Sequence, residues 1–349
     1  MFDLRLKKCK KNGRELRAGS RPKISAITDT ISSAIIKLPH KHRNNILKLS
    51  NKTTPQRRAT GKPFFHLLLV IVLLMFGITQ NSFATDRTPH PFVVSGVIIN
   101  SHNADLIERF ARYLSEKSGY PLQVVYVNKY AELSRVLRED PKAVGWTCGA
   151  PYVQDSKTNG QKLVAVPLFN KKPTYHSLVL ARSDRTEKTL ADFKDGVLAY
   201  SDSRSNSGYL APRYVLHKQG IDINKHFRLL LNTGSHEGSI KALIHNLADV
   251  AAVDEYIWQA YLKEHPEAGE KLREIERMGP FPFTPIVSGV SVDDDEINQL
   301  SSALLGMDDN AEGQKLLSEF YLDGFVEKKP AFYQLIKNML EEVNIESRN

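Results

Sequence analysis

Strand-like and helix-like segments alternate along most of this chain, and this alternation constrains the fold more than any other feature. The β-rich run Phe92–Ile99 is followed by a helical stripe over Asn103–Ser118 and by a second strand at Leu122–Val127. A short helix at Tyr130–Arg138 and a strand at Ala143–Trp146 continue the pattern. Such alternation predicts a βαβαβ unit, in which helices cover a sheet built mainly of parallel strands.

Residues 184–280 repeat this architecture without repeating the sequence. Strands are predicted at Gly196–Tyr200, Phe227–Asn232 and Val250–Val253, with a helix that begins near Ser235 between the last two. The other predicted elements are strands at Lys162–Pro167, Tyr175–Ala181 and Ile286–Val292, and helices at Thr189–Phe193, Asp295–Leu305, Ala311–Glu319 and Lys329–Val343. The sequence therefore predicts an α/β protein with two units.

Pro280–Pro285 contains three prolines in six residues, and this density predicts an irregular crossover between the two units. The aromatic stretch Glu319–Phe325 is interpreted as a short linker that packs into the core. The proline-rich segment would carry the chain back from the second unit to the first.

The basic residues are concentrated in the leader. The chain has 349 residues and a formal net charge of +9, but residues 1–62 hold 17 Lys or Arg and 3 Asp or Glu. Residues 63–349 hold the remaining 31 basic and 36 acidic residues, so this part is mildly acidic. We therefore exclude nucleic-acid binding by the folded part.

An apolar run precedes the predicted folded part. Residues 1–63 are interpreted as a basic N-terminal extension, and residues 64–84 as a signal-peptide apolar region with its cleavage site. The run Phe64–Ile78 has 15 residues, fewer than the roughly 20 that span a bilayer, so a permanent anchor is the weaker interpretation. Ser82-Phe83-Ala84 supplies small residues at cleavage positions, and the exported chain would begin at Thr85.

The stretch Ser201–Gln219 indicates a strand that leads into an anion-binding helix start. Ser205, Asn206 and Ser207 follow a short apolar strand and precede an apolar-periodic segment. Free backbone N–H groups and the positive end of the helix dipole attract oxyanions at such a place. Gly208 would allow a close approach of the backbone. An ordinary capped helix remains the alternative on spacing alone.

Cysteine and histidine give little sign of a metal site or disulfide. Cys9 lies in the leader and Cys148 in the predicted folded part, so that part holds a single thiol. Histidines are scattered, without the spacing of a metal motif on one helix face. We predict neither a metal centre nor a cofactor.

Several motifs together resemble one family. Ser205-x-Ser207-Gly208-Tyr209, Gly234-Ser235-His236, Ala252-Val253-Asp254 and the Pro282–Val287 element occur in order over about residues 92–340. They resemble the phosphate, phosphite and phosphonate-binding proteins of bacterial ABC importers. The resemblance implies a type 2 periplasmic-binding-protein fold with two lobes, a small oxyanion held between them, and a permease and ATPase as partners of a monomeric periplasmic protein.

The resemblance also implies where the lobes divide. Lobe one would comprise residues 92–180 plus 288–349, and lobe two residues 181–287. The crossovers would be Tyr175–Arg182 and Pro282–Val290, and the lobes would close about them.

Ligand-binding residues are carried over by position. Ser205, Asn206 and Ser207 match the oxyanion-binding triplet, His236 a cleft-facing histidine, and Tyr130 an aromatic of the opposite lobe.

Further positions depart from the family pattern. Thr147 and Cys148 replace an aromatic wall, and Arg204 and Asp254 are additional candidate contacts. Tyr256 and Thr284 stand where aminophosphonate binders place carboxylates, which argues against an aminoalkylphosphonate.

Two other functions are compatible with the residues. A periplasmic sensing subunit that feeds a membrane histidine kinase would have the same folded chain. A serine hydrolase would use the same Ser, His and Asp types, but the chain lacks a Gly-x-Ser-x-Gly elbow. An ester-cleaving activity is therefore the more remote alternative.

Export provides the first test. If the small residues at 82 and 84 are read by a signal peptidase, N-terminal sequencing of the protein from the periplasmic fraction will begin at Thr85. Recovery of uncleaved chain in the membrane fraction would instead show that residues 64–78 act as an anchor.

Overall fold

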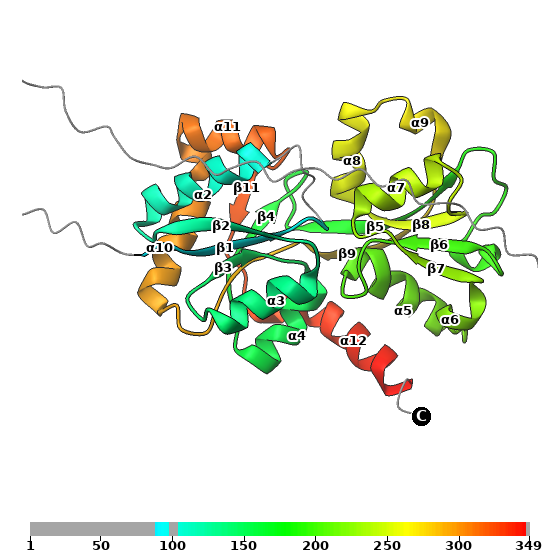
Figure 1. The fold of residues 1–349 in the computed structure, drawn as a ribbon, viewed down its shortest axis with the longest axis horizontal. Helices are drawn as coiled ribbons and strands as arrows, with labels where there is room; N and C mark the ends of the chain where they lie inside the picture. Colours follow the sequence, from blue (N-terminus) through cyan, green and yellow to red (C-terminus); the bar gives the residue numbers. More distant parts are fainter. Residues whose placement is uncertain (1–87, 98–103, 347–349) are drawn as a thin grey trace, which may run out of the picture. The chain divides into compact units, whose positions relative to one another are not determined.

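The computed structural model describes residues 88–97 and 104–346. The predicted N-terminal extension and signal peptide lie outside these residues, as does the end of the strand predicted at Phe92–Ile99. Two α/β units are present, each built on its own sheet (Figure 1). The predicted alternation of strands and helices is thereby confirmed.

The first unit is a six-stranded sheet in the order β11-β4-β10-β3-β1-β2. Its strands are β1 (His90–Ser95), β2 (Leu122–Val127), β3 (Val144–Trp146), β4 (Lys162–Leu168), β10 (Ile286–Ser288) and β11 (Gly324–Val326). β1 pairs in parallel with β2 and β3, whereas β10 is antiparallel to both of its neighbours. The carboxyl ends of β1 and β3 consequently lie at the same edge.

Helices cover both faces of this sheet (Figure 1). They are α2 (Ala104–Ser118), α3 (Tyr130–Glu139), α4 (Gly149–Asn159), α10 (Asp294–Leu305) and α11 (Ala311–Glu319), with a 3₁₀ turn, η4 (Gly306–Asp309), between the last two. In Figure 1, α2, α10 and α11 lie on one side and α3 and α4 on the other. This layering follows from the apolar stripes of the helices, which must be buried against the sheet.

The second unit is a five-stranded sheet in the order β7-β6-β8-β5-β9. Its strands are β5 (Thr174–Arg182), β6 (Val197–Tyr200), β7 (Leu229–Asn232), β8 (Val250–Asp254) and β9 (Leu272–Pro282). β6 is parallel to β7 and β8, and β5 is antiparallel to β8 and β9. Its helical segments are η2 (Leu190–Phe193), η3 (Asn206–Leu210), α5 (Ala211–Lys218), α6 (Ile223–His226), α7 (His236–Ile244), α8 (Glu255–Glu264) and α9 (Ala268–Lys271).

Strand pairing shows that the chain passes from the first sheet to the second before residue 174, which is earlier than the sequence predicted. Tyr175–Arg182 was predicted to cross between lobes, but the whole of β5 pairs within the second sheet. The connections between sheets are instead residues 169–173 and 283–285. They lie side by side, because the Phe283 N–H donates to the carbonyl of Pro173 at 2.9 Å.

The proline-rich segment is more regular than predicted. Pro280–Pro282 forms the end of β9, where it pairs with Thr174 and Tyr175 of β5. β9 is next to only one other strand in its sheet, so its prolines are tolerated where a central strand would need every N–H. Only the last three residues of the predicted crossover, 283–285, lie outside both sheets.

Several elements were missed, and others ended early. Helices α4 and α8 and strand β9 had no predicted counterpart, and β10 ends at Ser288 rather than Val292. The aromatic stretch 319–325 does pack into the core, because the Phe320 ring lies 5.5 Å from those of Phe110 and Trp146. Its last two residues, however, begin strand β11.

The C-terminal segment contacts both units. It consists of a 3₁₀ turn, η5 (Pro330–Tyr333), and helix α12 (Gln334–Glu346). The Tyr333 ring packs on Tyr152 of α4, whereas Arg213 of α5 donates to the Val343 carbonyl. Residues 288–349, predicted to belong to lobe one, therefore end in a helix that touches both lobes.

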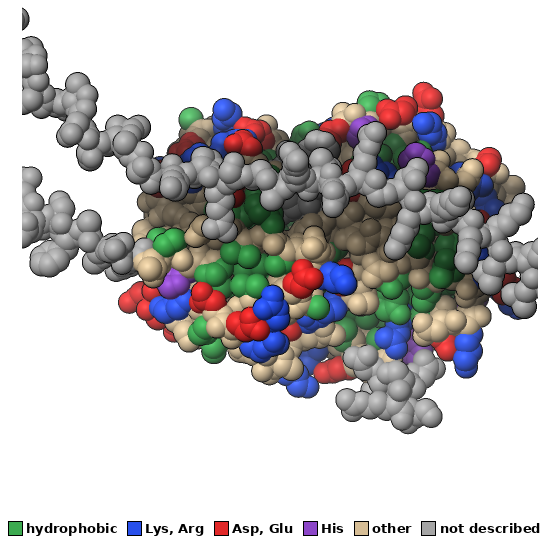
Figure 2. Space-filling view, in the orientation of Figure 1, with side chains coloured by type: hydrophobic (Ala, Val, Ile, Leu, Met, Phe, Trp, Pro, Cys, Tyr) green, Lys and Arg blue, Asp and Glu red, His purple; other side chains and the backbone are tan. Residues whose placement is uncertain are grey.

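The visible surface carries mixed charge. On the face that Figure 2 shows, acidic and basic side chains are interspersed without one dominant sign. This mixed charge is unlike the basic stripe that binds a nucleic-acid backbone. Among the described helices, none has the length and apolar character needed to span a bilayer.

Phe283 provides a test of the connection between sheets. Its fully buried ring lies 5.8, 5.4 and 5.5 Å from the rings of Phe169, Tyr175 and Tyr256. Phe283→Ala should lower the free energy of unfolding by about 3–5 kcal/mol, because it leaves a cavity among these rings. Urea denaturation with Phe332→Ala, a partly buried control, will measure the difference; equal losses would contradict the assigned packing.

Candidate functional site

Most of the predicted ligand residues lie where strands end. Ser205–Ser207 follows β6, Asp254 ends β8, and Ser177 of antiparallel β5 pairs with Asp254. In the other unit, Thr147 and Cys148 follow β3 directly. The carboxyl ends of parallel strands are the edge at which α/β sheets bind ligands.

The predicted triplet forms a tight turn rather than the first turn of an α-helix. Asn206–Leu210 is a single π-helical turn, in which the Leu210 N–H donates to the Ser205 carbonyl at 3.0 Å. Ser205 caps it, since its Oγ accepts from the Gly208 N–H at 3.0 Å. Regular helix begins only at Ala211, so the predicted helix start is displaced by one π turn.

The backbone N–H groups of this turn are largely engaged by protein atoms. The Asn206 N–H donates to Cys148 Sγ at 3.4 Å, and the Gly208 N–H donates to Ser205 Oγ. Two of the amides expected to be free, those of Asn206 and Gly208, are therefore engaged by protein atoms. Side chains of the triplet supply the polar groups that face the interior.

Gly208 is required by a close approach to protein atoms. A Cβ at this position would lie 2.3 Å from Ser201 Oγ and 3.1 Å from Ser205 Oγ. Any larger residue would displace the two hydroxyls, so the need for glycine comes from the packing of the turn itself.

His236 is a neutral hydrogen-bond donor. The ring is buried, and this burial lowers its pKa to about 3. Its Nδ1 accepts from the Asp254 N–H at 3.1 Å, so the proton of the neutral ring is on Nε2. Nε2 faces Ser201 Oγ at 3.3 Å and Ser205 Oγ at 3.5 Å, and it donates toward them. This tautomer cannot accept a serine proton, so it gives no support to a hydrolytic triad.

Asp254 is a buried carboxyl whose burial raises its pKa to about 7. Its Oδ1 accepts from the Tyr256 N–H at 2.9 Å, and its Oδ2 accepts from Ser207 Oγ at 3.3 Å. Asp254 therefore both caps α8 and contacts the triplet.

The first unit contributes three buried residues to the same place. Tyr130 opens α3, Cys148 precedes α4, and the two pack together with Val97. Burial raises the pKa of the Cys148 thiol, so the sulfur stays protonated and behaves as a weak polar contact. Thr147 is buried beside it, held through its N–H by the Pro285 carbonyl at 3.0 Å.

Three polar atoms at this meeting point have no hydrogen-bond partner. They are the Tyr130 hydroxyl, Thr147 Oγ1 and Asn206 Oδ1, and all three residues are at most 1% exposed. Cys148 links them, because it follows Thr147, packs with Tyr130 and accepts from Asn206. Buried polar atoms are normally paired, so these three unpartnered atoms make this place the candidate ligand site.

Arg204 is not part of this cluster. Its guanidinium group donates to Gln154 Oε1 at 3.0 and 3.1 Å and to Asp155 Oδ1 at 2.8 Å, and it also bonds Ser134. These partners lie on α3 and α4 of the first unit. The predicted contact of Arg204 with an anion is replaced by a contact with the opposite lobe.

Sequence reasoning missed residues that hold the triplet from behind. Tyr175 OH accepts from Asn206 Nδ2 at 3.0 Å, and Ser177 Oγ donates to the Ser207 carbonyl at 2.7 Å. Both lie on β5, two residues apart and thus on one face of the strand. In the sequence, these two residues stand out as a polar pair at the start of an otherwise apolar strand, and this pattern could have identified them.

Tyr256 and Thr284 stand at the positions where the resemblance implied carboxylates in aminophosphonate binders. Both side chains are neutral and form hydrogen bonds with other protein groups. The Tyr256 hydroxyl donates to the Phe320 carbonyl at 2.8 Å, and Thr284 Oγ1 accepts from Trp146 Nε1 at 3.2 Å. Neither side chain offers a charge to an amine.

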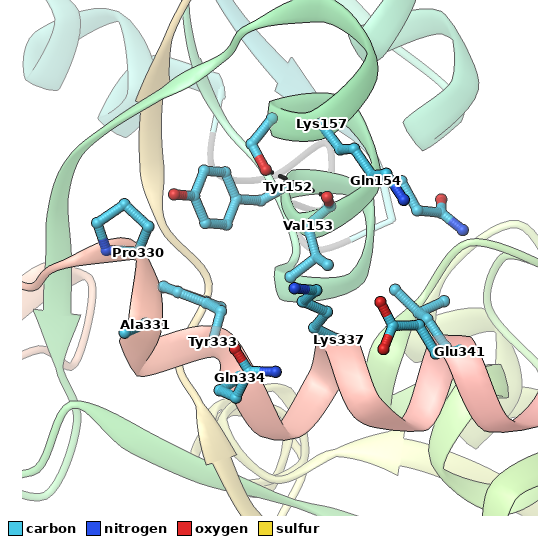
Figure 3. Close-up of a pocket in the computed structure, with 12 residues that line it drawn as sticks. Tyr152, Val153, Gln154, Lys157, Pro330, Ala331, Tyr333, Gln334, Lys337 and Glu341 are labelled. Carbon is cyan, nitrogen blue, oxygen red and sulfur yellow. Dashed lines mark hydrogen bonds between the residues drawn. The ribbon is translucent and has the colours of Figure 1, made fainter.

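A separate pocket of about 910 Å³ lies between α4 and the C-terminal segment (Figure 3). Gln154 and Lys157 line one side, and Lys337 and Glu341 of α12 line the other. None of the nine predicted ligand residues lines it. Within the described ranges, no group of three or more His, Cys, Asp or Glu side chains is placed to hold a metal ion.

Comparison with known proteins identifies the family of this chain. Residues 100–333 match the family model of the periplasmic substrate-binding protein of phosphonate ABC transporters. The chain is 23% identical over 183 residues to the phosphonates-binding periplasmic protein of Escherichia coli, and the match covers 51% of this chain. That match spans about half (54%) of the relative's length. A probable phosphite-binding protein of an ABC transporter from Prochlorococcus marinus is 23% identical over 215 residues, covering 58% of this chain and 71% of the relative.

Solved structures show the same fold. A binding-protein component of an ABC phosphonate transporter from Pseudomonas aeruginosa has a TM-score of 0.67 and 22% identity, over 74% of this chain and 87% of its own. A Prochlorococcus marinus protein in complex with methylphosphonate has a TM-score of 0.66 and 18% identity, over 74% and 99%. These likenesses confirm the two-lobed, type 2 periplasmic-binding-protein fold. With the family model matching most of the folded chain, this protein belongs to the family of periplasmic substrate-binding proteins of phosphonate ABC transporters.

Proposed function

We propose that this protein binds a small tetrahedral oxyanion of the phosphate, phosphite or phosphonate class between its two lobes and delivers it to an ABC permease and ATPase. The observation that carries the proposal is the set of three buried, unpartnered polar atoms on Tyr130, Thr147 and Asn206. They come from both lobes, and they lie next to the Ser205–Ser207 turn. The family supports the periplasm as the place where the ligand is captured.

The available donors favour a tetrahedral oxyanion. The hydroxyl groups of Tyr130 and Thr147 have no partner, whereas Ser207 Oγ and the Nε2–H of His236 would have to turn from Asp254 and from Ser201 and Ser205 to reach a ligand. Rotating the Asn206 amide by 180° would keep its bond to Tyr175 and present its NH₂ group to the ligand. Several neutral donors around one point match the several oxygens of such an anion, as in other preorganised oxyanion sites.

Charge limits the ligand to a small net negative charge. The residues assigned to the cluster include no Lys or Arg once Arg204 is directed to the opposite lobe. The one ionisable carboxyl, Asp254, has a raised pKa because of its burial. A singly charged oxyanion is therefore a better fit than a dianion, which would lack a balancing cation in a buried site.

Capture rather than catalysis follows from His236. A serine nucleophile needs a base that accepts its proton, and His236 donates through Nε2 toward both nearby serines. The same donor suits a ligand that is held without reacting.

The triplet gives the direct test of the site. Ser207→Ala should weaken binding of methylphosphonate or phosphite by about tenfold to a hundredfold, because a hydrogen bond to a charged group contributes about 1.5–3 kcal/mol. The exposed Ser203→Ala, in the same loop, should leave affinity unchanged. Isothermal titration calorimetry measures both, and the melting temperature of the free variants reports on the fold. Unchanged affinity with a lowered melting point would show a purely structural Ser207.

The pH dependence of stability tests Asp254. Because burial raises its folded pKa to about 7 above an unfolded value near 4, the folded state holds this proton more tightly. Its contribution to stability is complete below about pH 4 and is lost as pH rises to about 7. Asp254→Asn should remove this loss, so the difference in unfolding free energy between variant and wild type will grow across that range. Parallel curves from pH 4 to 7 would contradict the raised pKa.

The same carboxyl should affect binding. Above about pH 7, ionised Asp254 places a negative charge beside the Ser207 hydroxyl, and anion affinity should fall. The anion titrates as well, so Asp254→Asn supplies the control curve: the wild type should lose more affinity between pH 6 and 8 than this variant does.

A further inference from the structure

Arg204 joins the two lobes through the most elaborate polar contact between them in the described residues. Its guanidinium nitrogens donate to Gln154 Oε1, Asp155 Oδ1 and the Ser134 hydroxyl. Ser134 in turn donates to the second oxygen of Asp155. One side chain of the second lobe thus engages two helices of the first.

The environment of this contact makes it sensitive to lobe separation. The Asp155 side chain is 7% exposed and that of Arg204 is 22% exposed. A carboxylate this buried needs its cation, because removing one partner leaves an uncompensated charge. If the lobes separate, water can solvate Asp155 instead. The ion pair therefore stabilises the closed arrangement specifically.

The loop that carries Arg204 also carries the ligand triplet. Its turn is fixed by Asp202: the Ser205 N–H donates to the Asp202 carbonyl, and the Arg204 N–H donates to the Asp202 side chain at Oδ1, at 2.7 Å. Neither bond uses the Arg204 side chain. The side chain is consequently free to act between lobes while the turn keeps its shape.

Neutral hydrogen bonds also cross between the lobes near the site, among them the bond from the Tyr256 hydroxyl to the Phe320 carbonyl at 2.8 Å. The Asn206 N–H donates to Cys148 Sγ at 3.4 Å, and the His236 N–H donates to the Val97 carbonyl at 3.3 Å. These two amides are neutral donors with long bonds, whereas Arg204 forms charge-assisted bonds of 2.8–3.1 Å. Arg204 is therefore the strongest of these interlobe contacts.

We propose that Arg204 is a positioning residue that holds the closed, ligand-retaining form through Asp155, and so sets how fast the bound anion leaves. The proposal rests on the proposed function for its effect on ligand release, but its effect on closure does not depend on any ligand. The residue touches neither the unpartnered atoms nor the triplet side chains, so it acts through the arrangement of the lobes.

Hydrogen exchange tests closure without a ligand. In dialysed protein free of added anion, Arg204→Ala should speed exchange of the Asn206 and His236 amides about tenfold, because separated lobes break both interlobe bonds. Arg182→Ala is the matched control, since Arg182 is 24% exposed and pairs with Asp184 inside one lobe. Unchanged exchange in Arg204→Ala, or equal acceleration in both variants, would overturn the proposal.

Ligand kinetics test retention, with methylphosphonate and phosphite as the probes. Arg204→Ala should raise the dissociation rate about tenfold and change the association rate less, since closure follows capture. Arg204→Lys, which keeps the charge but not the planar fork, should fall between wild type and Arg204→Ala. A dissociation rate equal to that of wild type in Arg204→Ala would refute the proposal.

A double variant distinguishes loss of the Arg204–Asp155 ion pair from damage caused by an unpaired Asp155. Removing Asp155 as well as Arg204 eliminates the unpaired buried carboxylate, so Arg204→Ala with Asp155→Ala should show no faster exchange than Arg204→Ala alone. Additive effects would mean that the two residues act independently and would count against the proposal. If neither methylphosphonate nor phosphite binds while hydrogen exchange responds as expected, the proposed ligand class is wrong. The role of Arg204 in lobe closure is then still supported.

Discussion

The site depends on the cost of burying polar groups without partners. Tyr130, Thr147 and Asn206 each place such an atom where two lobes meet, and each lost hydrogen bond costs about 1–3 kcal/mol. Tyr175 of β5 holds the Asn206 amide, and the Asp254 N–H holds the His236 ring. In the proposed site, a bound oxyanion would satisfy the unpartnered atoms, and this gain would oppose the cost of closing the lobes.

The sequence analysis assigned both the neutral donors and Arg204 to ligand binding. The structure gives them different partners. Burial keeps His236 uncharged and its pKa low, and the Asp254 N–H fixes its tautomer. The arginine next to the triplet binds the other lobe instead of the ligand. In the proposed function, recognition would use hydrogen-bond geometry, whereas Arg204, the charged residue next to the triplet, would contribute to closure.

The topology brings both tasks to one edge. In each sheet three parallel strands place their carboxyl ends at one edge, and an antiparallel strand, β5 or β10, lies next to them. The two connecting segments are joined by the Phe283 to Pro173 hydrogen bond and by the stacked rings of Phe169 and Phe283. Loops of both sheets can then approach a common point while the connection between them stays short.

The sequence alone determined the α/β class, the two units and most strand positions, because apolar periodicity is a local property that survives in the fold. It also identified Ser205–Ser207, Tyr130, His236 and Asp254 as residues of one neighbourhood, although part of that came from resemblance to a family. Tertiary structure decided what local pattern could not. Sheet membership of β5 and β9 depends on pairing with distant strands, and the proline-rich end of β9 became regular because it lies beside one neighbour only. The direction of Arg204, the tautomer of His236 and the unpartnered state of the three polar atoms each depend on residues tens of positions away, whose contacts only the folded chain creates.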